Sequence, residues 1–171
     1  MEDEASLYLQ ATTMATWAPR GQTPVVRADP GREKVNFYGT LNPRTGDEIA
    51  MRAAVMNAEV TAQHLNQVLA TVPGVPILFL WDRAPWHRGQ AIREVLEANP
   101  RLEIMHFPVA APELNPQEQV WKAARRAASH NHVMQRLPDL ADRFEQYLTS
   151  NAFASSFLHR YGCEQIRPRF I

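Results

Sequence analysis

The chain has 171 residues, and 18 Lys and Arg balance 18 Asp and Glu, so its formal net charge at pH 7 is zero. A hydrophobic content of 45% with 21% charged residues is typical of a folded domain and excludes general disorder. Neutral charge gives no overall attraction to nucleic acid or anionic membranes, so a DNA-binding function requires local positive charge or another segment.

No segment of the sequence is typical of export or of a membrane span. The longest run of large apolar residues, Val75–Trp81, is far shorter than the ~20 residues that cross a bilayer. The first residues, Met1–Glu4, are acidic and lack the basic start of a signal peptide. Cys163 is the single cysteine, which excludes an intramolecular disulfide. We expect a cytoplasmic protein of one domain, residues 1–171, with no membrane partner.

The first half of the chain has the pattern of an antiparallel meander. Segments of apolar and β-prone residues, separated by turn residues, predict strands over Ala5–Gln10, Thr23–Arg27, Lys34–Leu41 and Glu48–Ala54. The turn residues at 42–46, which include Asn, Pro and Gly, join the last two of these strands.

The second half alternates helical and strand patterns. Two short apolar runs, Val75–Trp81 and Leu102–Phe107, predict strands that are buried on both faces. Helical periodicity predicts the remaining elements, over Asn57–Thr71, Gln90–Ala98, Pro116–Ser129, Leu137–Leu148 and Ala152–Tyr161. Antiparallel strands followed by β-α-β units predict the α/β class, with one mixed sheet flanked by helices and a helical C-terminal part, residues 133–171.

Three carboxylates are expected at one end of this sheet. Asp82 directly follows a buried strand, where open α/β sheets place ligand-binding groups. Asp3 lies at the first strand, and Glu118 lies in the first turn of the helix that follows the last strand. Converging carboxylates repel one another unless they share a cation, and hard divalent cations prefer oxygen ligands. The pattern therefore indicates metal-dependent attack on a phosphodiester.

Each of these residues also has a structural interpretation. Asn115, Pro116 and Glu118 make a good helix start, with Asn as the N-cap and Pro at the first helical position. Glu118 and Lys122 form an ordinary i,i+4 pair. Asp82 can cap a turn, and an acid in the position of Asp3 is often simply solvated. No single residue decides between the two interpretations.

The combination of motifs resembles a known family. Residues 81–87 (Trp-Asp-Arg-Ala-Pro-Trp-His) and 107–122, which contain Pro112-Glu113-Leu114-Asn115-Pro116-Gln117-Glu118, are similar to the catalytic core of mariner-related transposases of insertion-sequence family 630. The start of the chain, from Asp3-Glu4 to the Trp17–Gly21 hairpin, resembles the first motif of that family. The resemblance covers roughly residues 2–130.

The resemblance implies a ribonuclease-H-like fold with an Asp-Asp-Glu triad at Asp3, Asp82 and Glu118. In that family the triad holds two Mg²⁺ or Mn²⁺ ions. Water first cleaves the phosphodiester at a transposon end, and the freed 3′-hydroxyl then attacks target DNA. Family members also carry an N-terminal helix-turn-helix DNA-binding region, which precedes the first Asp and is absent from these residues; the analogy further implies a homodimer.

Basic and polar residues near the triad are candidates for DNA binding. They follow the second and third acids, where they could hold phosphates: Arg83, His87, Arg88, Asn115, Lys122, Arg125 and Arg126. Arg83 stands where the family motif has Asn. His130-Asn131-His132 spells a nuclease motif but follows a helix directly, so we assign it no catalytic role. The four tryptophans, among them Trp17, are expected to pack the core rather than stack on bases, with Trp86 as the exception.

The sequence is therefore consistent with three functions. The first is a DNA transposase catalytic domain, which the three intact acids favour. The second is a catalytically inactive transposase remnant or interaction protein, which the missing N-terminal region and the zero net charge favour. The third is another ribonuclease-H-like nuclease that cuts RNA or hybrid duplexes.

Overall fold

The computed structural model describes residues 1–26, 32–109 and 111–153. Three antiparallel strands come first: β1 (Glu2–Tyr8), β2 (Lys34–Leu41) and β3 (Glu48–Ala53). They form one sheet in the order β1-β2-β3, and Asp3 of β1 lies opposite Gly39 of β2. The predicted meander is confirmed for these three strands.

The next elements alternate between helix and strand: α1 (Ala58–Thr71), β4 (Ile77–Trp81), α2 (Gln90–Ala98) and β5 (Leu102–His106). β4 and β5 pair in parallel, with Trp81 beside His106. Helix α1 begins after Asn57, whose side chain accepts a hydrogen bond from the Val60 amide at 2.8 Å.

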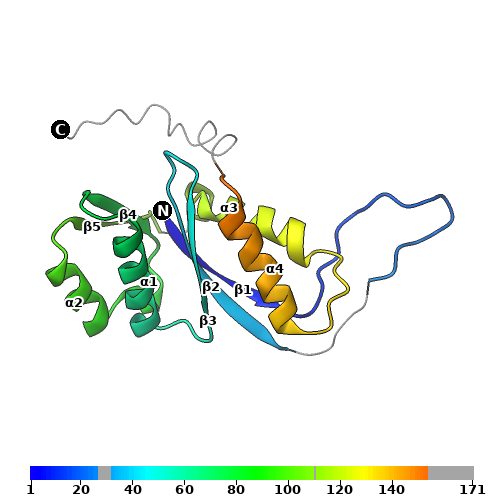
Figure 1. Cartoon of the computed structure of the whole chain (residues 1–171), viewed down its shortest axis with the longest axis horizontal. Helices are drawn as coiled ribbons and strands as arrows, with labels where there is room; N and C mark the ends of the chain where they lie inside the picture. Colours follow the sequence, from blue (N-terminus) through cyan, green and yellow to red (C-terminus); the bar gives the residue numbers. More distant parts are fainter. Residues whose placement is uncertain (27–31, 110, 154–171) are drawn as a thin grey trace.

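The prediction of one mixed sheet is only partly right. Within the described residues the strands form two sheets, one of three strands and one of two. β1 and β4 are in contact where the sheets adjoin, but no ladder pairs them (Figure 1). Apolar patterning specifies which segments become strands and which face they bury, but it does not specify the lateral neighbour of each strand.

The last described elements are α3 (Gln117–Ala124) and α4 (Leu137–Ser150), which lie on one side of the three-stranded sheet (Figure 1). The single helix predicted over Pro116–Ser129 is divided, because Arg125–Ser129 forms a π-helical turn, η3. Its end is marked by the His130 amide, which donates to the carbonyl of Arg125 at 2.8 Å. Of the helix predicted over Ala152–Tyr161, residues 152–153 are not helical and residues 154–161 lie outside the described part.

Two apolar cores lie on opposite sides of the sheet. One joins the strands to α3 and α4, with Phe37, Trp121 and Phe144 among its fully buried members. The other joins α1 and α2 to β4, with Leu65, Phe79 and Trp81 among its members. The first core therefore holds α3, which carries Glu118, and the second holds β4, which precedes Asp82.

The strands β4 and β5 are not buried on both faces, which corrects the sequence prediction. Leu78 and Met105 are each 49% exposed, whereas Phe79 and Trp81, which point to the other face, are buried. A continuous apolar run is consistent with either arrangement, because it lacks the polar alternation that would mark a solvent face.

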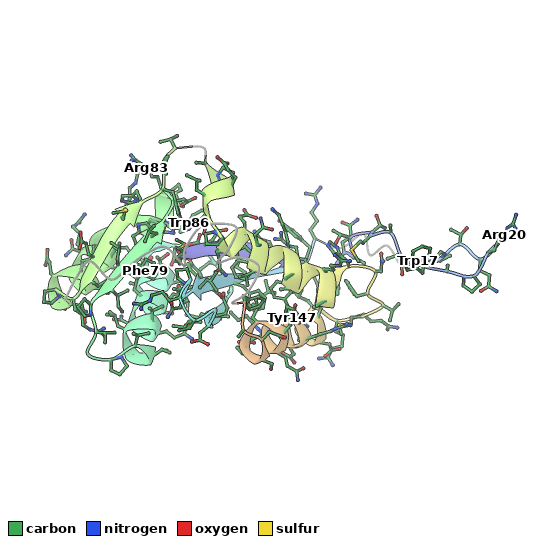
Figure 2. All side chains as sticks on the ribbon, turned by 90° about the horizontal axis from the view of Figure 1, so that it is seen from above. Trp17, Arg20, Phe79, Arg83, Trp86 and Tyr147 are labelled. Atoms are coloured by element: carbon green, nitrogen blue, oxygen red, sulfur yellow. The ribbon has the colours of Figure 1, made fainter. Side chains whose placement is uncertain are left out.

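Residues 10–26 form an arm that leaves the body of the molecule (Figure 1). The strand predicted over Thr23–Arg27 is wrong for its described residues, 23–26, since Val25 is 90% exposed and no described strand pairs with them. Trp17 is fully exposed, so its predicted core role is also wrong, while Trp81 and Trp121 are buried as predicted. Figure 2 shows Trp17 and Arg20 on this arm, far from Phe79 and Arg83.

The root of the arm is held by the segment that resembles a nuclease motif. Asn131 has φ 52°, a left-handed conformation that Asn tolerates, and its side chain forms two hydrogen bonds with the backbone of Met14, at 2.9 and 2.8 Å. Thr12 forms a bridge with His130. These residues have a structural role here, in agreement with the sequence analysis. No helix in the described part of the chain is long and apolar enough to cross a membrane.

Candidate active site

One cavity of about 340 Å³ brings the three predicted acids together. Asp3 enters it from β1, Asp82 from the loop after β4, and Glu118 from the first turn of α3. The rest of the wall comes from the same loops and includes Arg83, Phe107 and Asn115. Three segments far apart in the sequence thus place a carboxyl group at one site.

Asp82 is held by its own loop. Its Oδ1 accepts a hydrogen bond from the Ala84 amide at 2.7 Å and lies 3.1 Å from His87 Nδ1. The side chain is nevertheless 55% exposed. The turn-capping interpretation of Asp82 is therefore correct, and the same geometry orients the carboxylate at the cavity.

Glu118 is positioned by the helix start that the sequence predicts. Asn115 Oδ1 accepts a hydrogen bond from the Gln117 amide at 3.2 Å, and Pro116 already has helical torsion angles, φ −65° and ψ −20°. The Asn115 amide group also donates to the Glu2 carbonyl at 3.1 Å, which ties the start of α3 to β1. No ion pair joins Glu118 to Lys122 within the described residues, so the predicted i,i+4 pair does not form.

Gly39 allows α3 to approach the strand that lies beside Asp3. A Cβ atom at this position would collide with Glu48, Gln117 and Trp121. Gly39 also pairs directly with Asp3 across the β1–β2 ladder. The absence of a side chain on β2 therefore sets the distance between the sheet and the helix that carries Glu118.

Burial and neighbouring charge act together on Asp3. Burial raises the pKa of the Asp3 carboxyl to about 7, and the charges of Glu118 and Glu4 contribute to the same shift. The donor set is three carboxylates, which suits a hard divalent cation. The ligand atoms of the three acids are not, however, all within 4.8 Å of one another, since the single such group among the described residues is Glu2, Glu4 and His87.

Most of the predicted cationic residues are exposed, and one of them lines the cavity. Arg83 lines it and forms no ion pair with Asp82 within the described residues; Figure 2 shows its side chain at the end of β4. Arg88 is exposed and donates to the Arg83 carbonyl at 3.3 Å, while Lys122 and Arg126 are exposed on α3 and η3. Arg125 is partly buried and donates to the Ser6 carbonyl at 3.4 Å.

His87 and Asn115 are buried, unlike the other predicted DNA-binding residues. The His87 ring stacks on Trp81, with centroids 4.3 Å apart and planes 4° from parallel. Its Nε2 lies 3.0 Å from Glu4 Oε1, which also accepts a hydrogen bond from Trp86 Nε1 at 2.6 Å. These contacts direct the polar atoms of His87 into the protein.

Glu2 and Glu4 also belong to this region, although the sequence motifs assign them no role of their own. The alternation of side chains along β1 was a usable signal, because it puts residues 2 and 4 on the face opposite Asp3. Two acidic side chains that lie next to each other on one face of a strand must either be exposed to solvent or contact a partner inside the protein. Here that partner is His87, from the short helix η1 (Pro85–His87) that follows Asp82.

Comparisons with known proteins agree with the motifs. The sequence profile of the DDE superfamily endonucleases matches residues 1–141. The 39 kDa protein of insertion element IS630 from Shigella sonnei is 24% identical over 148 residues, which cover 86% of this chain and 43% of that protein. The y4pE/y4sA protein of Sinorhizobium fredii is 26% identical over 105 residues, covering 61% of this chain and 75% of that protein. The chain thus spans less than half the length of the IS630 protein.

Solved structures of Mos1 mariner transposase have a similar fold. The catalytic domain of that enzyme matches 94% of this chain and 76% of its own length, with a TM-score of 0.60 and 14% identity. The Mos1 paired-end complex with Mg matches 94% of this chain and 51% of its own chain, with a TM-score of 0.69 and 17% identity. At these identities the likeness establishes the mixed α/β fold of the Mos1 catalytic domain.

Proposed function

Because the chain belongs to the DDE superfamily of endonucleases, among the mariner-related transposases of the IS630 type, we propose that it cuts and joins DNA as a transposase catalytic domain. Its substrates are phosphodiester bonds at transposon ends, and the freed 3′-hydroxyls then attack target DNA. The observation that carries the proposal is the convergence of Asp3, Asp82 and Glu118 on one cavity.

In this proposal the three acids hold two divalent cations, Mg²⁺ or Mn²⁺, the metals named in Mos1 structures. Bound by these acids, the cations would supply Lewis acidity toward the phosphate and toward the attacking hydroxyl. The protein contributes oxygen donors on three rigidly packed elements. The raised pKa of Asp3 supports this role, because a carboxyl group buried among other acids ionises more readily when a cation compensates its charge.

The exposed cations around the cavity hold the DNA backbone. Arg83 lines the cavity, and Arg88, Lys122 and Arg126 are exposed on the adjoining segments. Guanidinium and ammonium groups bind phosphate oxygens without reading sequence. His87 and Asn115 act indirectly, since their polar atoms are engaged with Glu4, Asp82 and the Glu2 carbonyl.

Recognition of transposon ends requires more than this domain. A zero net charge gives little general affinity for DNA, so we assign end recognition to a helix-turn-helix segment outside these 171 residues. By analogy with the family, the proposed active assembly is a homodimer.

Plasmid nicking tests the proposal. Supercoiled plasmid is incubated with the chain and Mn²⁺, and the nicked product is compared with that of Asp82→Asn and Glu118→Gln. We expect each variant to lower the nicking rate at least about 100-fold, because loss of a metal ligand removes several kcal/mol of transition-state stabilisation. Glu113→Gln is the matched control, since Glu113 is an exposed acid of the adjacent turn that does not line the cavity.

The alternatives predict different results. A chain that leaves the plasmid intact with Mn²⁺, and whose melting temperature responds to Mn²⁺ no differently from that of Asp82→Asn, is the inactive remnant. A chain that cuts an RNA–DNA hybrid but not duplex DNA is the hybrid nuclease. Either result would overturn the assignment to DNA transposition.

A further inference from the structure

A second group of ionisable side chains lies on the face of β1 opposite Asp3. Glu2, Glu4 and His87 each offer a ligand atom, and these atoms all lie within 4.8 Å of one another. Glu4 Oε1 is 3.0 Å and Glu2 Oε2 is 3.4 Å from the same atom, His87 Nε2. The three side chains are only 1–3% exposed. This group is separate from the cavity, because none of its members lines it.

Glu2 has no hydrogen-bond partner for either carboxylate oxygen within the described residues. Leaving a buried polar group unsatisfied costs free energy, so such groups almost always have a partner. The missing hydrogen-bond partners of the Glu2 carboxyl group therefore indicate that a ligand binds its oxygens.

The tautomer of His87 leaves a lone pair in the middle of the group. His87 Nδ1 is 3.2 Å from the Asp82 carbonyl oxygen, and a carbonyl oxygen can only accept, so Nδ1 carries the hydrogen. In the neutral ring, Nε2 then presents its lone pair to the oxygens of Glu2 and Glu4. Three electron-rich atoms converge on one point. A single shared proton can bridge Nε2 and Glu4, but it leaves Glu2 unsatisfied.

The spacing of these atoms suits a metal ion. Zinc binds imidazole nitrogen and carboxylate oxygen at about 2.0–2.2 Å, so two ligand atoms at 90–110° lie about 3.0–3.4 Å apart. The separations of 3.0 and 3.4 Å to His87 Nε2 agree with this range. Imidazole with carboxylates is also a donor set typical of first-row transition metals such as zinc and manganese.

Neighbouring groups orient the ligands as metal sites require. A metal-bound His usually donates its other N–H to a carbonyl or carboxylate, as His87 Nδ1 does toward Asp82. The Trp81 ring stacks on the imidazole and fixes its plane. Trp86 Nε1 donates to Glu4 Oε1 at 2.6 Å and so fixes the second ligand.

We propose that Glu2, Glu4 and His87 bind one divalent transition-metal ion, with zinc as the best match, in a structural site separate from the cavity of the three acids. The ion joins β1 to the loop that carries Asp82. It supplies a ligand for the Glu2 carboxylate, whose oxygens accept no hydrogen bond from the described residues. The site does not depend on the proposed transposase activity.

Zinc titration of the full chain tests this site. The cavity is first disabled by Asp3→Asn with Glu118→Gln, while Asp82 is kept because it contacts His87. Isothermal titration calorimetry with Zn²⁺ and thermal unfolding with and without Zn²⁺ are then measured. We expect one equivalent of Zn²⁺ to bind and to raise the melting temperature. Adding Glu2→Gln or His87→Ala should weaken binding at least about 100-fold, and Trp86→Phe about 10-fold to 100-fold.

The variants also separate lost binding from lost folding. Glu2→Gln conserves shape and removes a buried charge, so without metal it should melt at or above the temperature of the disabled parent. Glu103→Gln removes an exposed acid of β5 and should leave Zn²⁺ binding unchanged. If the disabled parent binds no Zn²⁺, or if it binds equally well with Glu2→Gln, the site does not exist. Neither result affects the nicking assay, so the two proposals fail independently.

Discussion

The two faces of β1 place their acidic side chains in different environments. The odd-numbered face carries Asp3 at its end and then continues into the apolar core through Ala5 and Leu7. The even-numbered face buries Glu2 and Glu4 beside His87, outside the lining of the cavity of the three acids. The first face leaves its carboxylate beside a cavity of about 340 Å³ lined by two other acids. The second encloses its carboxylates completely.

This difference shows that proximity of acids does not by itself define an active site. The enclosed group has the closer ligand atoms, within 4.8 Å of one another. The open group has space for a substrate and cationic residues around it. Under our two proposals, access and surrounding charge separate the proposed catalytic site from the proposed structural metal site, although both begin in one strand.

The largest expected effect comes from the apolar part of the odd face. Leu7→Ala should lower the free energy of unfolding by about 2–5 kcal/mol, because Leu7 is buried in the core with α3 and α4. Urea unfolding measures this. Ser6→Ala is the matched change on the even face; it loses one hydrogen bond to Asn36, of 2.9 Å, and should cost only about 1 kcal/mol. Equal costs would contradict the contrast between the faces.

Gly39→Ala should disturb the odd-numbered face of β1 beside Asp3, at the cavity of the three acids. The added methyl group meets Glu48, Gln117 and Trp121, so α3 must move away from the sheet. We expect a loss of about 1–3 kcal/mol in urea unfolding. The part of any Mn²⁺-dependent rise in melting temperature that Asp82→Asn abolishes should also be lost, since Glu118 moves with the helix. Gly21→Ala is a poor control because of its positive φ, so Ala5→Gly in the same sheet is preferable.

Glu48 is a third buried carboxyl group, on the odd side, and it belongs neither to the cavity lining nor to the Glu2–Glu4–His87 group. Burial raises its pKa from 4.5 to about 8, although a 2.6 Å hydrogen bond from Gln117 opposes the shift. Its contribution to stability is fully present below pH 4.5 and is lost as the pH rises through about 8. Glu48→Gln should therefore stabilise the metal-free protein by about 1–2 kcal/mol at pH 8 and little at pH 4. Thermal unfolding with EDTA at both pH values measures the difference.

Trp17 should have the smallest effect on stability. Its side chain is fully exposed on the arm, outside both faces of β1. Trp17→Ala should change the free energy of unfolding by less than about 0.5 kcal/mol, which urea unfolding followed by circular dichroism can verify. A larger loss would mean that the tryptophan packs against the body of the protein.

Much of the fold follows from the sequence because apolar periodicity specifies element type. The strand over Lys34–Leu41 and the helix over Gln90–Ala98 occur with the predicted bounds. What periodicity does not contain is the neighbour of each element. It therefore gave no sign that β4 and β5 have an exposed face, or that Val25 in the arm has no partner strand.

The candidate site was predictable to a similar degree. The motif around Asp82 and the helix start at Asn115 specify two of its acids, and the cavity joins them to Asp3 as expected. The burial of His87 was not predictable, because its partner Glu4 lies 83 residues away in the chain. The π-helical turn was also missed, since residues 125–129 contain no Gly or Pro to interrupt the helical pattern.

The contacts of Asn131 also determine the distance between the cavity and the root of the arm. They hold the root of the arm at the end of η3, whereas Glu118 lies at the opposite end of the same continuous segment, residues 117–129. Thirteen residues of helix measure roughly 20 Å. Any single ligand that touches both the cavity and the root of the arm must therefore be at least that long, which is about six base pairs of duplex DNA.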